Sequence, residues 1–110
     1  MARSYLPEQV TRDDVDRLPG LTVLQFGTDW CGYCQAAEPA IAEALSGLDV
    51  DRHVLVEDGK GRPLGRSFRV KLWPTLIFLR DGVEVARTIR PWKAEDFTEA
   101  LTVVRAAGGR

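Results

Sequence analysis

The order of apolar patterns along the chain is the feature that most limits how it can fold. Short apolar runs rich in strand-forming residues alternate with segments of helical spacing, and the last two runs flank a hairpin-type Asp81-Gly82. Such an order predicts an α/β fold, a central mixed β-sheet flanked by helices on both faces. The expected elements are a helical turn from Thr11 that Pro19 and Gly20 stop, strands at 21–26, 53–58, 75–79 and 83–89, and helices at 34–48, 62–70 and 94–107.

Length and composition favour one domain. The 110 residues, 45% of them hydrophobic, can bury a substantial core, so residues 1–110 are expected to form a single domain with a frayed tail at about 106–110. The near balance of 15 basic and 16 acidic side chains gives no sign of a nucleic-acid or membrane-surface partner. The N-terminus has no apolar signal core, and no apolar run approaches the roughly 20 residues of a membrane span. We therefore expect a cytoplasmic monomer.

Both cysteines of the chain, Cys31 and Cys34, stand in the stretch WCGYC, between an apolar run and a helical pattern. A disulfide across so short a loop removes little entropy from the unfolded chain, so a structural bridge is a poor explanation. A zinc site needs four ligands, whereas the chain has two Cys and one His, and His53 falls in a strand pattern away from the pair. Two inert buried cysteines are the plain alternative.

A reactive pair has a physical mechanism. If Cys31 caps the helix, unpaired backbone N–H groups and the helix dipole favour its thiolate, which is the nucleophile in disulfide exchange. Cys34 then lies one helical turn later, close enough to attack a mixed disulfide formed on Cys31. A Cys-x-x-Cys motif near a strand–helix pattern is typical of redox proteins, so the sequence favours a redox-active dithiol.

Over nearly its whole length the sequence resembles the thioredoxin family. TDWCGYC is similar to the Trp-Cys-x-x-Cys active site, Pro39 falls where the family has a proline in the active-site helix, and WPTLIFLRDGVEV is similar to the cis-proline strand and hairpin. The resemblance implies the thioredoxin fold and a cis bond before Pro74. It also implies a thiol–disulfide oxidoreductase in which Cys31 attacks a protein disulfide, Cys34 resolves the mixed disulfide, and Pro74 presents the backbone of residue 73 to the substrate.

The resemblance implies no organic cofactor and no metal, with a reductase or another dithiol protein as electron donor.

Two alternatives to this function stay open. Gly32-Tyr33 between the cysteines, where thioredoxins usually have Gly-Pro, resembles the pair in bacterial disulfide isomerases. A residue other than proline keeps a backbone N–H that can donate to a thiolate sulfur, and this stabilises the reduced form of the pair. A pair with a more stable reduced form is more oxidising, as in a net oxidant or isomerase. The other alternative is a non-enzymatic module in which two chains hold zinc or an iron–sulfur cluster through Cys31 and Cys34.

Aromatic residues near the motif are candidates for substrate binding. Trp30, Tyr33 and Trp73 are expected to ring the disulfide as an apolar platform for partner polypeptides. Trp92, in the loop after the last strand, is a further candidate for this platform. A core or edge aromatic residue is the plain alternative for Trp73.

Two departures from the family pattern concern the proton of Cys34. Gln25 stands where thioredoxins carry a buried acid beneath the second cysteine, and Leu55 stands at the position of its usual lysine partner. Gln25 cannot take up a proton at neutral pH, whereas Glu38 can, and it follows Cys34 by one helical turn on the same face. We expect Glu38 to replace the missing acid as the proton acceptor for Cys34. A solvated helix carboxylate is the alternative.

Other charged side chains near the motif are expected to take no part in the chemistry. His53 is expected to be an ordinary strand residue, and Asp29 a surface residue of the active-site turn. A group of basic residues after the second strand is expected to form a solvated helix face rather than a docking patch. These residues are Arg62, Arg66, Arg69 and Lys71.

Overall fold

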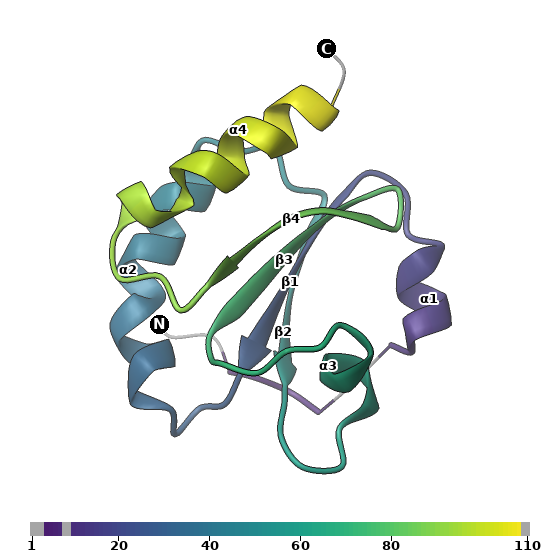
Figure 1. Cartoon of the computed structure of the whole chain (residues 1–110), viewed down its shortest axis with the longest axis vertical. Coiled ribbons are helices and arrows are strands. Elements are labelled where there is room, and N and C mark those ends of the chain that lie inside the picture. The colour runs from purple at the N-terminus through teal and green to yellow at the C-terminus, as the bar shows by residue number, and fades with distance from the viewer. Residues whose placement is uncertain (1–3, 8–9, 109–110) are drawn as a thin grey trace.

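The computed structural model describes residues 4–7 and 10–108, which form a four-stranded mixed sheet in the order β2-β1-β3-β4 with helices around it (Figure 1). The strands are β1 (Leu21–Gly27), β2 (Arg52–Glu57), β3 (Thr75–Arg80) and β4 (Val83–Ile89). β1 pairs with β2 in parallel and with β3 in antiparallel orientation, and β3 and β4 form the predicted hairpin. Every residue of β1 is buried, as expected of a central strand.

Helices cover both faces of this sheet, which confirms the predicted architecture. The helices are α1 (Arg12–Asp16), α2 (Gly32–Ser46), α3 (Pro63–Ser67), the 3₁₀ turn η1 (Ala94–Phe97) and α4 (Thr98–Ala107). In Figure 1, α2 and α4 lie on one side of the sheet, and α1 and α3 lie on the other. The region around Cys31 and Cys34 is formed mainly by β1 and α2, together with the segments next to them.

Two apolar clusters, one on each face, hold the layers together. Val23 of β1 packs with Phe97 on the side of α2 and α4, whereas its neighbour Leu24 packs with Phe68 on the side of α1 and α3. Burying one such side chain contributes about 1.5–3 kcal/mol relative to leaving it exposed. Because side chains alternate along a strand, Gln25 points to the same side as Val23, toward α2.

Local signals explain where two elements begin and turn. Thr11 caps α1 through the predicted capping box, in which its hydroxyl accepts the Asp14 N–H at 3.1 Å and the Asp14 carboxylate accepts the Thr11 N–H at 3.0 Å. Asp81 and Gly82 have φ values of 53° and 83°, so both residues of the hairpin turn are left-handed. A turn with two such residues matches the twist of the strands that it connects.

Three boundaries differ from the sequence prediction. α2 begins at Gly32, earlier than expected, so that Cys31 is its N-cap. α3 has only 5 residues and is followed by Arg69 in a left-handed conformation, φ 59°, which a helix cannot continue through. The last helix ends at Ala107, as predicted, but its first turn is the 3₁₀ segment η1, so α4 itself begins only at Thr98. In the tail predicted to fray, residues 106–107 are helical, and residues 109–110 lie outside the described residues.

The N-terminal segment, residues 4–7, makes a contact that no sequence pattern predicts. Leu6 forms an isolated parallel bridge with Val56 on the free edge of β2. The Leu6 N–H donates to the Leu55 carbonyl at 3.3 Å, and the Leu6 carbonyl accepts the Glu57 N–H at 2.8 Å. This pairing places Tyr5 in the interior, with 8% of its surface exposed.

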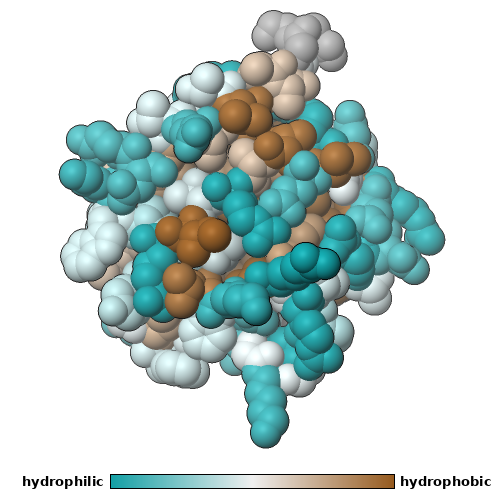
Figure 2. Space-filling model, viewed as in Figure 1, coloured by the Kyte–Doolittle hydropathy of each residue, from teal (hydrophilic) through white to brown (hydrophobic). Residues whose placement is uncertain are grey.

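The surface is mixed in character. On the face shown in Figure 2, apolar side chains reach the surface in small patches with hydrophilic side chains between them. Across residues 4–7 and 10–108, no helix combines the length and apolar character that crossing a bilayer requires. Two exposed aromatic side chains stand next to the cysteines in the sequence. Trp30, 74% exposed, precedes Cys31, and Tyr33, 50% exposed, precedes Cys34.

Candidate active site

The cysteines lie where the chain passes from β1 into α2. Cys31 is the N-cap of α2 in an extended conformation, and its Sγ accepts the backbone N–H of Cys34 at 3.2 Å. The first N–H groups of a helix have no partner within the helix, and the helix dipole places partial positive charge there. The unpaired N–H groups and the positive end of the helix dipole both favour negative charge on a sulfur atom placed there. The predicted position of Cys31 at the helix cap is confirmed.

Cys34 is the more deeply buried of the pair, with 1% of its surface exposed against 6% for Cys31. Burial raises the pKa of Cys34 to about 12, and the hydrogen bond with the Cys31 sulfur contributes to the rise. Cys34 is therefore a neutral thiol near pH 7 and must lose its proton before it can attack a disulfide.

A hydrogen-bonded group of side chains, centred on Gln25, lies beneath the cysteines. The Gln25 Nε2 group donates to Glu38 Oε2 at 3.0 Å and to the Tyr5 hydroxyl oxygen at 2.5 Å. Gln25 Oε1 lies 2.8 Å from His53 Nε2. Since an amide oxygen only accepts, His53 carries its hydrogen on Nε2 and donates it to Gln25. His53 lies in β2, as predicted, and its ring also supports this network.

Tyr5 is a site residue that the sequence analysis missed. A Cβ added to Gly27 would lie 2.5 Å from Cys34 Sγ and 3.0 Å from Cζ of Tyr5, so the ring and the sulfur share the space over this glycine. The Tyr5 N–H donates to Asp29 Oδ1 at 2.8 Å and ties the N-terminal segment to the active-site turn. Burial raises the pKa of the Tyr5 hydroxyl far above its ordinary value, so the group stays protonated.

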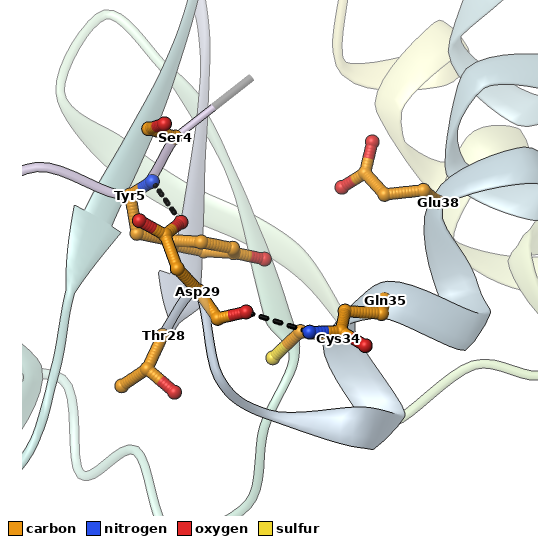
Figure 3. Close-up of a pocket in the computed structure, with 7 residues that line it drawn as sticks. All are labelled: Ser4, Tyr5, Thr28, Asp29, Cys34, Gln35 and Glu38. Carbon is orange, nitrogen blue, oxygen red and sulfur yellow. Dashed lines mark hydrogen bonds between the residues drawn. The ribbon is translucent and has the colours of Figure 1, made fainter. Parts of the chain in front are cut away.

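A cavity of about 510 Å³ opens beside Cys34 (Figure 3). In Figure 3 the side chains of Tyr5 and Glu38 point toward the same space, one from the N-terminal segment and one from α2. Glu38 is half-buried, and its carboxylate is held by Gln25 within this space. The lining residues are Ser4, Tyr5, Thr28, Asp29, Cys34, Gln35 and Glu38. Cys34 therefore has a carboxylate and room for solvent beside it.

Trp30, Tyr33 and Trp73, here called the aromatic rim, lie on the chain segments that border the cysteines. The Trp30 and Trp73 rings meet edge to face with their centroids 5.7 Å apart. Trp73 packs against the buried cluster that contains both cysteines, and its indole N–H donates to Asp58 at 2.9 Å. Tyr33 stands half exposed at the start of α2. The structure thus places two of the three predicted platform residues in direct contact.

Arg90 joins Tyr33 to the segment before Pro74. Its guanidinium carbon lies 3.8 Å from the centroid of the Tyr33 ring, and its Nε donates to the Trp73 carbonyl at 2.9 Å. The Trp73–Pro74 bond is cis, as the resemblance implies, and the Pro74 carbonyl accepts the Arg90 N–H at 2.7 Å. Arg90 has a φ of 48°, uncommon for a residue other than glycine. Sequence analysis did not select Arg90, because one basic residue after a strand has no distinctive pattern.

The other candidates have different surroundings. Trp92 is 74% exposed and lines a separate hollow with Arg90 and Pro91. In the basic group, Arg62 pairs with Glu57 at 2.6 Å. The remaining members are exposed, in agreement with a solvated face, and two of them line a hollow beside Trp73: Arg66 and Lys71.

Leu55 occupies the position next to Gln25 in the sheet and is buried with both cysteines. An apolar neighbour there leaves the Gln25 amide to be satisfied by Tyr5, Glu38 and His53. In the part of the chain that the structure describes, no group of three or more His, Cys, Asp or Glu side chains is placed to hold a metal ion.

Comparison with known proteins agrees with this geometry. The family model of thioredoxin matches residues 8–103. The structure resembles that of thioredoxin 2 from Pseudomonas aeruginosa PAO1 in its reduced form, with a TM-score of 0.83 and 55% sequence identity over 96% of this chain and 99% of that chain. The fold and the Cys-x-x-Cys site define a protein of the thiol–disulfide oxidoreductase class. The chain belongs to the thioredoxin family.

Relatives of two kinds share this domain. Thioredoxin H2-1 of Oryza sativa subsp. japonica is 31% identical over 75 residues, which are 68% of this chain and 54% of that protein. Protein disulfide-isomerase A2 of Pongo abelii is 40% identical over 68 residues, which are 58% of this chain and 13% of that protein. The chain thus spans about half of the first relative and a small part of the second.

Proposed function

We propose that this protein reduces or exchanges disulfide bonds of other proteins through Cys31 and Cys34. The observation that carries the proposal is the Cys31 sulfur at the N-cap of α2, where it accepts the Cys34 N–H at 3.2 Å. A sulfur at the positive end of a helix dipole is suited to act as a thiolate nucleophile, and a second, buried thiol lies one turn away. Membership of the thioredoxin family supports the same roles.

The first step is attack by the Cys31 thiolate on one sulfur of the substrate disulfide. The substrate S–S bond breaks, a mixed disulfide with Cys31 forms, and the other substrate sulfur leaves as a thiolate. In the second step Cys34 loses its proton and attacks the Cys31 sulfur. The Cys31–Cys34 disulfide forms, the second substrate sulfur leaves, and the substrate has gained two electrons.

We propose Glu38 as the acceptor of the Cys34 proton. It lines the same cavity as Cys34, and its carboxylate is anchored by the Gln25 amide at 3.0 Å. A carboxylate in this position can remove a proton that Gln25 cannot take up. The anchoring by Gln25 supports a defined place for this carboxylate over the plain alternative of a freely solvated one.

For substrate binding we propose the aromatic rim, with Trp30 and Trp73 as an apolar platform beside the cysteines. Trp30 is 74% exposed, so its ring is available to a partner polypeptide. The Trp73 carbonyl accepts one hydrogen bond from Arg90 and keeps a second lone pair for an extended substrate, consistent with Pro74 presenting this backbone. A reductase or a dithiol protein supplies the electrons. Its identity, the cytoplasmic compartment and the monomeric state stay predictions.

A net oxidant or isomerase is the second candidate, favoured by Tyr33 within the first turn of α2. A proline there would lack the N–H that Tyr33 keeps near the sulfur, and each such donor favours the reduced dithiol. Equilibration of the pair against glutathione separates the two directions. A potential close to that of thioredoxin, about −270 mV, indicates a reductase, and one close to −120 to −180 mV indicates an oxidant or isomerase.

Trapping of the mixed disulfide tests the function itself. Cys34→Ser should accumulate a covalent adduct between Cys31 and a disulfide-containing protein, because the second attack is lost. Cys31→Ser should form no adduct and should show no reductase activity. Mass spectrometry of the adduct identifies the linked cysteine. An adduct through Cys34 in the Cys31→Ser variant, formed at the rate of the parent protein, would reverse the assigned roles.

A further inference from the structure

The hydrogen atoms of the network beneath Cys34 can be assigned one by one. Gln25 Nε2 has two hydrogens, and its two acceptors are Glu38 Oε2 and the Tyr5 hydroxyl oxygen. The Tyr5 oxygen therefore accepts from Gln25, and the hydrogen of its own O–H must point elsewhere. The Cys34 sulfur is the acceptor that the packing favours, since the sulfur and the Tyr5 ring both border the space over Gly27. The Tyr5 hydroxyl also acts to lower the pKa of Cys34, against the larger rise that burial causes.

We propose that Tyr5 is a further catalytic residue, whose O–H donates a hydrogen bond to the Cys34 thiolate as Cys34 attacks the mixed disulfide. The inference rests on the proposed exchange reaction. It adds to that reaction the hydroxyl of Tyr5, which lies in the N-terminal segment and not in β1 or α2. Tyr5 does not accept the proton; it stabilises the charge that remains on sulfur when Glu38 or water removes the proton. A buried charge without such a donor would be costly to form.

The surroundings of Tyr5 suit a permanent donor. The ring is buried with Cys31, Cys34 and Leu55, with 8% of the residue exposed, although it also borders the cavity beside Cys34. Its raised pKa keeps the hydrogen in place at every pH at which the protein would work. The Asp29 carboxylate fixes the Tyr5 N–H, and the Leu6 bridge to Val56 fixes the next residue, so the donor is held from both sides.

The charged groups that face Tyr5 come from three elements. Cys34 and Glu38 face it from α2, Asp29 faces it from the active-site turn, and His53 of β2 reaches it through Gln25. Of these, Glu38 and Cys34 exchange the proton in the proposed reaction. Because Tyr5 itself does not titrate in this range, its loss should slow resolution by the same factor from pH 6 to pH 9.

Single-turnover reaction with Ellman's reagent separates the two steps. Attack by Cys31 releases the first thionitrobenzoate, and attack by Cys34 on the resulting mixed disulfide releases the second. We expect Tyr5→Phe, which keeps the ring over Gly27, to leave the first phase within about two-fold of the parent and to slow the second by at least about ten-fold. Thr102→Val, which deletes an exposed hydroxyl on α4, is the matched control and should leave both phases unchanged.

A second variant covers the case in which Tyr5→Phe does not fold. Asp29→Ala removes the anchor of the Tyr5 N–H and leaves every core side chain in place, and it should slow only the second phase, by less than Tyr5→Phe. A folded Tyr5→Phe protein with a second phase at the parent rate overturns the proposal, as does a loss confined to the first phase. Failure of the exchange function itself would look different, because the parent would then release no thionitrobenzoate in a second phase at all.

Discussion

At Gly27 the absence of a side chain lets the Tyr5 ring and the Cys34 sulfur occupy one space. A Cβ there would lie 2.5 Å from Cys34 Sγ and 3.0 Å from Tyr5 Cζ, so one of them would have to move. We expect Gly27→Ala to lower the free energy of unfolding by about 1–3 kcal/mol, the usual cost of adding a methyl group to a filled interior. Urea unfolding of the reduced protein measures this loss.

Gly32→Ala is the matched control for stability. A Cβ at Gly32 meets no atom within 4 Å, and alanine is the better helix former, so this variant should be as stable as the parent or slightly more stable. An equal loss of stability in the two alanine variants would show that the space over Gly27 is not the cause.

Arg90 combines an unfavourable backbone conformation with favourable side-chain contacts. Its φ is 48°, while its guanidinium contacts Tyr33 and the Trp73 carbonyl. Arg90→Ala loses the contacts and keeps the strain, whereas Arg90→Gly loses the contacts and relieves the strain. We expect both to raise KM for a protein substrate, since the aromatic rim loses a support, and the glycine variant to be more stable than the alanine variant by about 1 kcal/mol. A glycine variant no more stable than the alanine variant would contradict this account.

At the scale of helices and strands, periodic patterns were sufficient to predict most of the fold. The apolar run at 21–26 and the helical spacing after Cys34 correspond to β1 and α2, and the Asp81-Gly82 pair correctly predicted the β3–β4 hairpin. The periodic pattern alone indicated a start of α2 at Cys34, whereas the predicted capping position of Cys31 agrees with the observed start at Gly32. The cysteine pair and the cis-proline segment could be located because their residue types are distinctive.

The parts that could not be predicted depend on single contacts between distant segments. Tyr5 stands in a short stretch with no periodicity, and its place beneath Cys34 follows from one bridge, Leu6 to Val56, and from the gap over Gly27. Nothing local to Tyr5 encodes either contact. The position of Glu38 on the Cys34 face of α2 was predictable from helical spacing, but its hydrogen bond to Gln25 required the register of β1 against the helix.

Within α2, the spacing of Cys34 and Glu38 leads to a kinetic prediction. We expect Glu38→Gln to slow disulfide reduction by about ten-fold or more near neutral pH, because general-base contributions are typically of that order or larger. The measurement is the rate of reduction of a protein disulfide from pH 5 to pH 9.

Glu43→Gln is the matched control within the same helix. Glu43 is exposed and lies further from the cysteine pair, so its substitution removes an equal charge without touching the cavity. Equal rates for Glu38→Gln, Glu43→Gln and the parent would mean that water, and not Glu38, accepts the proton.

In the molecule as a whole, the site depends on packing from every side. β1 supplies Gln25 and Gly27, α2 supplies both the second cysteine and Glu38, and the N-terminal segment closes the cluster with Tyr5. Closure of this cluster shields the Cys34 thiol and the Tyr5 hydroxyl from water, and the same shielding raises both pKa values. Folding and acid–base behaviour are therefore linked.

This linkage predicts how the stability of the reduced protein depends on pH. The pKa of Cys34 rises from 9.0 to about 12 on folding, so the folded state holds its proton more tightly than the unfolded state. The stabilisation is complete below about pH 9 and is lost as the pH rises toward 12, with a slope that approaches about 1.4 kcal/mol per pH unit. Urea unfolding at intervals between pH 8 and pH 10.5 should show this decline.

Cys34→Ala isolates the contribution of the thiol, because every other titrating group is shared with the parent. Its unfolding free energy should fall less steeply above pH 9, so the unfolding free energy of the parent minus that of Cys34→Ala should decrease as the pH rises. Tyr5 adds a second decline in both proteins only above its unfolded pKa near 10, so the window between pH 9 and pH 10 reports on Cys34. Parallel profiles in that window would mean that the Cys34 thiol is not shielded in the folded protein, and the proposed need for a proton acceptor at Glu38 and a donor at Tyr5 would lose its physical basis.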